Sequence, residues 1–181
     1  MKYSQQVKLK DGKTCLIRSG GMADAKAAWD CFKRTHEETD NLLSYADENI
    51  YNVNGEGEFL VKREASDKAA ELCAFVGGRL VGMAGIGPVG DKDKVKHRAE
   101  FGISIEKKWW GKGIGNYLTA TCIECAKAAG YLQVELEAVS SNEAAIALYE
   151  KYGFTEYGRN PRGFRKRDGE WQELVLMRLE L

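Results

Sequence analysis

The chain is poor in the features that mark several large classes of protein. It has two prolines in 181 residues, so no proline-rich linker separates domains, and it contains no internal repeat. No apolar run approaches the ~20 residues that a transmembrane helix needs. The first residues, from Met1 to Gln6, lack the apolar core of a secretory signal peptide. We therefore expect a single cytoplasmic domain over residues 1–181 that makes no membrane contact.

Neither charge nor metal-ligating side chains are in excess. Lysine plus arginine and aspartate plus glutamate number 27 each, a balance that argues against nucleic acid or an anionic membrane as partner. Two histidines are too few for a metal site, and five cysteines, an odd number, fit a reducing compartment. Cys122 and Cys125 form a Cys-x-x-Cys pair, but no second pair completes four ligands. We interpret them as small core residues and expect no metal; a redox or metal protein is the less favoured alternative.

One stretch, residues 97–154, organises the rest of the chain. Apolar residues first alternate with polar residues or glycine, a period of two that predicts a strand. A glycine-dense turn follows, and apolar residues at helical spacing then predict a helix. The predicted strand, turn, helix, strand and helix lie at 99–105, 110–115, 117–130, 132–139 and 143–152.

The glycine-dense turn has the composition of an anion site. Gly111, Gly113 and Gly115 let the backbone approach a phosphate without a Cβ in the way. The first amides of the following helix have no partner within the helix. The spacing does not match a mononucleotide P-loop, and no clear strand-end carboxylate follows about 20 residues on, as a dinucleotide site would need. From these residues alone, a tight turn without a ligand is an equal alternative.

The segment after the second strand favours the ligand-binding alternative. Asn142 opens a helical run that carries Tyr149 and ends at Gly153 and Phe154. In this order and at this separation, the glycine turn and the segment resemble the GNAT superfamily of N-acetyltransferases. The resemblance implies that the glycine turn holds the pyrophosphate of acetyl-CoA. At Trp110 the chain departs from the family, whose turn usually begins with Gln or Arg, although the backbone amides can still serve.

The resemblance implies acetyl-CoA as cosubstrate and a set of contacts to it. In the family, amides of the strand before the glycine turn hold the pantetheine arm by adding to an open strand edge. One of these amides, here at Ile103, is expected to polarise the thioester oxygen. The residues expected to contact acetyl-CoA are Ile103, Ser104, Ile105, Trp110, Gly111, Lys112, Gly113, Ile114, Gly115, Asn116, Asn142 and Tyr149. Asn142 also has the residue type that caps a helix whatever the function.

The implied chemistry needs proton transfer but no covalent nucleophile, because a thioester is already activated. The acceptor amine must lose a proton, directly or through water, and Glu100 and Glu137 on the two strands are the candidate general bases. A glutamate at either place serves in related acetyltransferases, and we favour Glu100; each could instead be a solvated carboxylate. Tyr149 is the expected general acid for the CoA thiolate, with helix packing as its alternative role.

The remaining residues predict one α/β (α+β) domain of the GNAT type. We expect a mixed, mostly antiparallel sheet flanked by helices on both faces, with one parallel crossover over 99–139. Further strands are expected over 6–18 (with a turn at Asp11 and Gly12), 72–76, 80–86, 154–158 and 171–181, and helices over 22–35 and 56–70. A basic run over 159–167 is expected to be a solvated end of the last hairpin, with contact to a phosphate of CoA or to an acidic acceptor as the alternative.

The sequence points to an amine acceptor and leaves its identity open. No Lys or Arg occurs over 36–58, the part of the chain where the resemblance places acceptor binding. An acidic rim there, including Glu37, Glu38 and Asp40, would attract a cationic amine, although a solvated helix face is the alternative. The expected function is acetyl transfer from acetyl-CoA to a primary amine of a small molecule or a protein. A non-catalytic acyl-CoA-binding sensor is the second hypothesis, and a homodimer could form if the apolar final strand pairs between subunits.

Overall fold

Eight strands form one sheet, and all neighbouring pairs in it but one are antiparallel. In this computed structural model, which describes residues 1–181, the strand order is β1-β2-β3-β4-β5-β6-β8-β7. The strands are β1 (Ser4–Lys8), β2 (Thr14–Ser19), β3 (Ala70–Val76), β4 (Arg79–Pro88), β5 (Arg98–Ile105), β6 (Gln133–Val139), β7 (Thr155–Arg165) and β8 (Trp171–Glu180). Because only β5 and β6 run parallel, the prediction of a mixed, mostly antiparallel sheet is confirmed.

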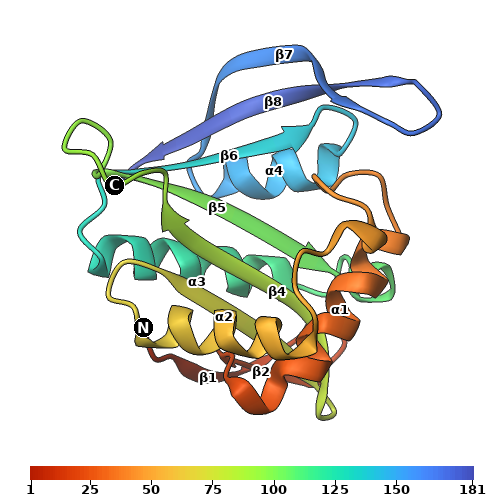
Figure 1. Cartoon of the computed structure of the whole chain (residues 1–181), viewed down its shortest axis with the longest axis vertical. Helices are drawn as coiled ribbons and strands as arrows, with labels where there is room; N and C mark the ends of the chain where they lie inside the picture. Colours follow the sequence, from red (N-terminus) through yellow and green to blue (C-terminus); the bar gives the residue numbers. More distant parts are fainter.

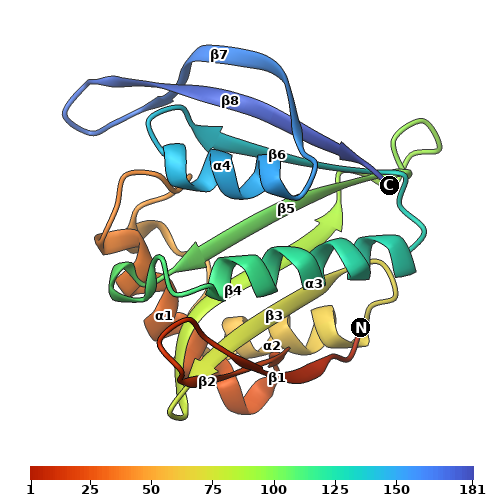
Figure 2. The same ribbon diagram turned by 180° about the vertical axis from the view of Figure 1, so that it is seen from behind.

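Four helices flank the sheet on both faces, as predicted. They are α1 (Ala25–Glu37), α2 (Val53–Ala65), α3 (Ile114–Ala128) and α4 (Glu143–Lys151), with 3₁₀ turns at Met22–Asp24, Ala46–Glu48 and Lys107–Trp109. α1 and α2 cover the face turned to the viewer in Figure 1, and α3 and α4 cover the opposite face, seen in Figure 2. None of these helices combines the length and the apolar character required to cross a membrane.

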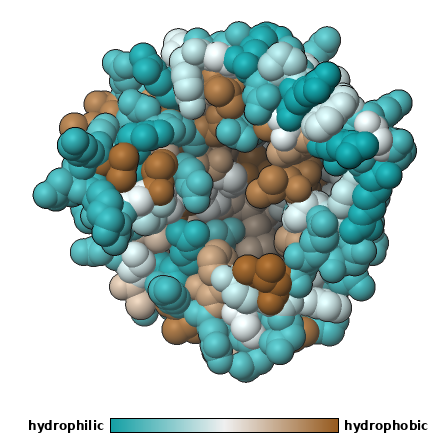
Figure 3. Space-filling view, turned by 45° about the horizontal axis from the view of Figure 1, so that its top comes forward, coloured by the Kyte–Doolittle hydropathy of each residue, from teal (hydrophilic) through white to brown (hydrophobic).

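The two faces of the sheet are covered unequally. The main core, a cluster of 28 buried residues, includes the inner sides of α3 and α4. A cluster of only six buried residues joins α1 and α2 to their side of the sheet: Ala28, Cys31, Leu60, Cys73, Phe75 and Leu80. The thinner cover leaves room on the α1/α2 face, and the space-filling view shows a hollow near its centre (Figure 3).

β5 and β6 pair over three residues and then separate. The pairing runs from Arg98 opposite Gln133 to Glu100 opposite Glu135 and does not continue beyond. Both ribbon views show the two strands diverging toward their C-terminal ends (Figures 1 and 2). The connection from β5 through α3 to β6 is the parallel crossover predicted over 99–139. The divergence leaves the second half of β5 with an unpaired edge.

The position of α2 differs from the predicted 56–70. The helix begins at Val53 because Asn52 caps it: its side-chain oxygen accepts a hydrogen bond from the amide of Gly55 at 2.9 Å. It ends at Ala65, and Ser66 is already in an extended conformation that leads toward β3. The predicted boundaries were therefore wrong by several residues at both ends.

β7 is longer than predicted, and the basic run 159–167 lies mostly within it. The strand tolerates Pro161 because β7 is at the edge of the sheet and its pairing with β8 is irregular there. Arg159, at the start of the run, pairs with Glu156 and Glu173 at 2.8 Å each. The run is therefore a paired strand surface, and the prediction of a hairpin end was wrong for most of it.

The final strand has no free edge. β8 is hydrogen-bonded to β6 on one side and to β7 on the other. The pairing between subunits that we predicted for this strand therefore has no place to form, and the chain offers β7 as the outer edge instead.

Cys122 and Cys125 lie in the main core on α3, as expected for packing residues. Burial raises the pKa of the Cys122 thiol well above its usual range. Both thiols are thus held in the neutral form, which is the poorer metal ligand and the poorer nucleophile.

A buried carboxylate ties α1 to the segment that follows β5. Glu106 is 1% exposed and accepts hydrogen bonds from Arg34 on α1 at 2.6 Å and from Arg79 at 2.9 Å. Lys108 lies 3.2 Å from the same carboxylate. Burial opposes ionisation, but the three cations outweigh it, and the pKa of Glu106 is lowered.

We expect Glu106→Gln to lower the free energy of unfolding at pH 7 by about 2 kcal/mol, because the substitution leaves cations without their partner. Since the folded pKa of Glu106 is lowered, its contribution is present above the unfolded pKa and is lost as the pH falls through the folded value. The difference from wild type should therefore shrink in acid, as urea unfolding at several pH values would show. The exposed Glu124→Gln is the control, and equal stabilities of the two variants would contradict the assignment.

Candidate active site

The unpaired half of β5 presents backbone groups to the gap between β5 and β6. The amide of Glu106 donates to the carbonyl of Val81 on β4 at 2.9 Å. In an antiparallel pair, successive residues direct their backbone groups to alternate sides, so Ile105 and Ile103 direct theirs toward the gap. The two amides expected to hold a pantetheine arm and a thioester oxygen thus lie on the open edge. Ser104, by the same alternation, directs its backbone to β4.

Trp110 folds back over this open edge. Its indole Nε1 donates to the carbonyl oxygen of Ile105 at 2.6 Å, while the residue remains 46% exposed. The indole therefore uses one backbone carbonyl of the strand edge. It does not extend into the glycine turn, as a side chain that donates to a diphosphate would.

The glycine turn before α3 presents a run of free backbone donors. The amides from Gly111 to Asn116 donate to no acceptor in the protein, and the amide of Tyr117 is the first to reach a carbonyl, that of Gly113 at 3.4 Å. Gly111 (φ 73°) and Gly113 (φ 98°) are both in the left-handed region that favours glycine. Consecutive free amides at the positive end of a helix are a site for phosphate groups.

Two of the residues expected to contact the cofactor also serve the packing of α3 against α4. A Cβ at Gly115 would lie 3.1 Å from Leu148, so this glycine lets α3 and α4 approach closely. The side-chain oxygen of Asn116 accepts a hydrogen bond from Lys151, and its carbonyl accepts one from Tyr152 at 2.9 Å. Only the backbone amides of Gly115 and Asn116 remain available to a ligand.

Three further expected contact residues have structural roles as well. Lys112 lies 3.4 Å from Asp11 of the β1–β2 turn, which draws its ammonium to one side of the glycine turn. Ile114 is buried in the main core and offers only its amide. Asn142 caps α4, as predicted, with its side-chain oxygen accepting from the amide of Ala145 at 3.3 Å.

Tyr149 lies on α4 against β5. It is 7% exposed and packs edge-on against Phe101, with ring centroids 6.1 Å apart, and against Phe154 at 5.9 Å. Its hydroxyl group forms no hydrogen bond within the protein. Burial raises the pKa of Tyr149 to about 12, so the phenol stays protonated at neutral pH. Because Phe101 is two residues before Ile103, Tyr149 faces the strand close to the open edge.

Both predicted bases lie on the α1/α2 face, opposite to Tyr149. Glu100 directly precedes the inward-facing Phe101, and Glu137 alternates with buried residues of β6, so both are exposed and neither forms an ion pair. Glu135 of β6 is opposite Glu100, and its carboxylate accepts a hydrogen bond from Arg98 at 2.7 Å. The guanidinium of Arg98 neutralises this carboxylate and lowers its pKa. The free carboxylates beside the gap are the two that the sequence predicted.

Two charged residues on the same face were not singled out from the sequence. Glu71 of β3 lies against Gly85 of β4, and Arg63 of α2 lies against Gly87. The available signal was the charge of Glu71 in a strand that is otherwise apolar, Ala70–Val76.

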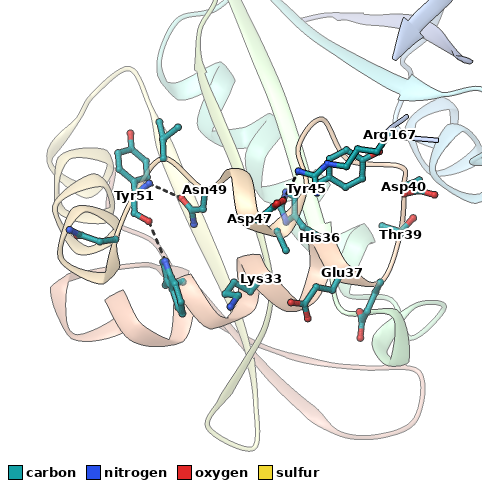
Figure 4. Close-up of a pocket in the computed structure, with 15 residues that line it drawn as sticks. Lys33, His36, Glu37, Thr39, Asp40, Tyr45, Asp47, Asn49, Tyr51 and Arg167 are labelled. Carbon is teal, nitrogen blue, oxygen red and sulfur yellow. Dashed lines mark hydrogen bonds and ion pairs between the residues drawn. The ribbon is translucent and has the colours of Figure 1, made fainter. Parts of the chain in front are cut away.

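One well-formed cavity lies away from the gap between β5 and β6. It measures about 980 Å³ and lies between α1, the segment after α1 and Arg167 of the β7–β8 turn (Figure 4). None of its lining residues belongs to β5, β6 or the glycine turn. We therefore place the candidate site by the free backbone groups and not by cavity size.

The acidic residues of 36–58 are partly neutralised. Glu38 accepts a hydrogen bond at 2.6 Å from the first amide of the 3₁₀ turn after β5, and Asp47 pairs with Arg167 at 2.7 Å. Glu37 and Asp40 remain exposed (Figure 4). Acidic residues thus lie at the edge of the cavity beside α1, but fewer of their charges are free than the sequence suggests.

Comparison with known proteins agrees with this geometry. The Acetyltransferase (GNAT) family matches residues 26–154, which is well over half of the chain. The chain belongs to this family. A GNAT acetyltransferase from Streptococcus pneumoniae has the same fold, with a TM-score of 0.88 and 30% identity over 92% of this chain and 99% of that chain.

Two other proteins also match. The protein yncA from Salmonella typhimurium, whose structure contains its cofactor acetyl-CoA, has a TM-score of 0.81 and 23% identity over 92% of this chain and 94% of that chain. L-amino acid N-acetyltransferase AaaT from Escherichia coli is 31% identical over 108 residues, 59% of this chain and 65% of that protein. The match to AaaT thus spans less than two thirds of its length.

We expect Gly113→Val to lower the affinity of this GNAT protein for acetyl-CoA by roughly 100-fold, the value of one or two charge-assisted hydrogen bonds. A β-branched residue cannot keep φ at 98° without moving the free amides. Gly169→Val, in the β7–β8 turn, is a matched control because φ is 94° there and a Cβ would meet nothing within 4 Å. Equal affinities of the two variants in calorimetry would remove the glycine turn from the cofactor site.

Proposed function

We propose that the protein is an N-acetyltransferase that transfers the acetyl group of acetyl-CoA to a primary amine of a small molecule or a protein. The observation that carries the proposal is the run of free amides from Gly111 to Asn116 beside the open edge of β5. Membership of the GNAT family and the acetyl-CoA bound to yncA support the choice of cosubstrate. The five unpaired cysteines fit a place in the cytoplasm.

The free backbone groups match the two ends of the cosubstrate. The amides of the glycine turn would hold the diphosphate, where the dipole of α3 adds positive potential. The amides of Ile105 and Ile103 would hold the pantetheine arm and the carbonyl oxygen along the edge of β5. This arrangement directs the thioester into the gap, between Tyr149 on one face and Glu100 on the other.

The transfer exchanges one bond for another and moves two protons. Acetyl-CoA supplies an acyl group that is already activated. The amine nitrogen forms a bond to the carbonyl carbon while the bond from carbon to sulfur breaks. Of the two protons that an ammonium acceptor loses, one goes to the general base and one ends on the CoA sulfur. The amide of Ile103 stabilises the negative charge that develops on the carbonyl oxygen.

The environment of Tyr149 refines its proposed role. The phenol of Tyr149 has a pKa of about 12, whereas a thiol has a pKa near 8.5. Proton transfer from the phenol to the thiolate is therefore energetically unfavourable by itself. Tyr149 therefore acts as a hydrogen-bond donor to the leaving sulfur and passes on a proton only as the amine supplies one in return.

Glu100 is the proposed general base. It lies on β5 three residues before Ile103, so one rigid strand carries both the base and the oxyanion donor. Glu137 has the same exposure but stands on the strand that diverges from β5. The exposed Glu37 and Asp40 would add a weak attraction for a cationic amine.

A non-catalytic acyl-CoA sensor is the second candidate, and Trp110 favours it. Its indole occupies the carbonyl of Ile105, which a bound pantetheine arm could otherwise use. Binding of acetyl-CoA without turnover on any amine would support the sensor.

Tyr149→Phe is expected to lower kcat by about 100-fold with little change in the affinity for acetyl-CoA, because the hydroxyl acts only when charge develops on sulfur. Release of CoA thiol in the steady state and calorimetry measure the two quantities. Tyr131→Phe is the control, since Tyr131 is equally buried but its hydroxyl donates to Lys68 far from the gap. Wild-type turnover of Tyr149→Phe would reduce Tyr149 to a packing residue.

Glu100→Gln is expected to lower kcat by at least about 100-fold, whereas Glu137→Gln should stay within a few fold of wild type. The two substitutions are matched in chemistry and exposure, so their comparison separates the two candidate bases. A large loss in Glu137→Gln alone would transfer the role to Glu137.

A further inference from the structure

A carboxylate without any ionic partner lies on the floor of the α1/α2 face. Glu71 of β3 is half-buried, and its carboxylate forms no ion pair and accepts no hydrogen bond. Its carboxylate lies over Gly85 of β4, in the space that a Cβ at that position would fill. The absence of a side chain at Gly85 thus makes room for the carboxylate.

A guanidinium without a carboxylate partner lies beside it. Arg63 of α2 is half-buried and stands over Gly87, with Nη1 2.5 Å from the position of an added Cβ. It donates to the carbonyl of Ile86 at 3.1 Å and stacks on Phe59, with the ring centroid 5.0 Å away. Arg63 and Glu71 act on each other through space, yet they do not form a salt bridge.

One row of paired residues connects Glu71 to the reacting edge of β5. Gly85 is opposite Glu71 on one side and Gly102 on the other. A Cβ at Gly102 would meet nothing within 4 Å, so the space above this residue is free. Gly102 directly precedes Ile103, whose amide faces the gap between β5 and β6.

The surroundings of Glu71 disfavour its charge in the free protein. Burial raises the pKa of Glu71 to about 7, although Arg63 lowers it, and Glu56 of α2 adds to the effect of burial. The other titratable neighbours are thiols, Cys73 on the same strand and Cys122 on α3, across the sheet. A cation placed next to the carboxylate would lower this pKa again, so a positively charged ligand stabilises the ionised form of Glu71.

We propose that Glu71 and Arg63 bind the acceptor, and that the acceptor is a free α-amino acid or a similar small molecule that carries a carboxylate next to its amine. The inference rests on the proposed acetyltransferase function and adds the class of acceptor to it. The ammonium lies over Gly102 and donates to Glu71, whose carboxylate covers Gly85, and the acceptor carboxylate binds Arg63, whose guanidinium covers Gly87. Gly85 and Gly87 are two residues apart on one strand, about 7 Å, which one small molecule can span.

This placement brings the acceptor nitrogen to the attacking position. The nitrogen lies above Gly102, next to the amide that holds the carbonyl oxygen. Glu71 binds the ammonium, and Glu100, two residues before Gly102 on the same face of β5, takes the proton that makes the amine nucleophilic. Glu71 is thus a specificity residue and Glu100 remains the base.

The first test compares acceptors on the wild-type protein. Each of the twenty L-amino acids is offered with acetyl-CoA, and for every one that reacts the corresponding amide and decarboxylated amine are offered too. We expect kcat/KM for the amino acid to exceed that for both analogues by roughly 10- to 100-fold, because a charge-assisted hydrogen bond is lost with the carboxylate.

The second test compares variants. Glu71→Gln should raise KM for the amino acid by roughly 10- to 100-fold with little change in kcat, and should remove from the pH profile of kcat/KM the step near pH 7 that belongs to Glu71. Arg63→Gln should raise KM for the amino acid by a similar factor but leave KM for the decarboxylated amine unchanged. Glu58→Gln and Lys62→Gln, two exposed positions on α2, are the matched controls. Melting temperatures and acetyl-CoA affinity show that each variant is folded.

The outcomes separate this proposal from the function on which it rests. If acetyl-CoA binds and other amines or peptides react while amino acids neither react nor bind the CoA-loaded protein, the acceptor proposal is wrong and the acetyltransferase stands. Variants of Glu71 and Arg63 that match their controls would also overturn it. Failure of the wild type to bind acetyl-CoA would contradict the proposed function itself.

Discussion

The site depends on the short pairing between β5 and β6. Two parallel strands that stayed paired to their ends would leave no free backbone on β5. Here the pairing ends at Glu100, and the amides of Ile103 and Ile105 have no strand to bind. Unpaired backbone groups inside a protein are costly, and a ligand that adds to the edge restores their hydrogen bonds. The gap is therefore a place where an extended chain, such as a pantetheine arm, is stabilised by the fold itself.

The residues proposed to bind the cosubstrate and those proposed to bind the acceptor lie on opposite faces of the sheet. In the proposed site the glycine turn and α3 would supply amides for a diphosphate, and α4 supplies Tyr149 on the well-packed face. The α1/α2 face has the thinner cover, and it carries the free carboxylate Glu100 and the unpaired charges Glu71 and Arg63. A cosubstrate and an acceptor can thus approach from opposite faces and meet at Ile103. The network around Glu106 fixes α1 to the segment that precedes the glycine turn. The α1/α2 face and the glycine turn are therefore held in a fixed position relative to each other.

Features that depend on neighbouring residues could be predicted from the sequence. The alternation before the glycine turn predicted β5, the glycines predicted the turn, and Asn142 with Tyr149 pointed to the family. Features that depend on register could not be predicted. That Glu71 shares a row with Gly85 and Gly102 follows only from the pairing of three strands.

The roles of single residues in the glycine turn show the same limit. Gly115 matches a phosphate-binding glycine in the sequence, yet its lack of a side chain is required by Leu148 of α4. The contact from Trp110 to Ile105 depends on the side of β5 to which the carbonyl points, which only the pairing with β4 decides. The start of α2 was different, because the signal, Asn52 as a cap, was present and was overlooked.

The central claim is that the open edge of β5 and the glycine turn together hold the acyl-CoA cosubstrate. Amide hydrogen exchange, followed residue by residue with and without CoA, tests it most directly. The account predicts that CoA slows exchange at Ile103 and Ile105 and at the amides from Gly111 to Asn116. Protection confined to the cavity between α1 and Arg167, or no protection at all, would contradict it.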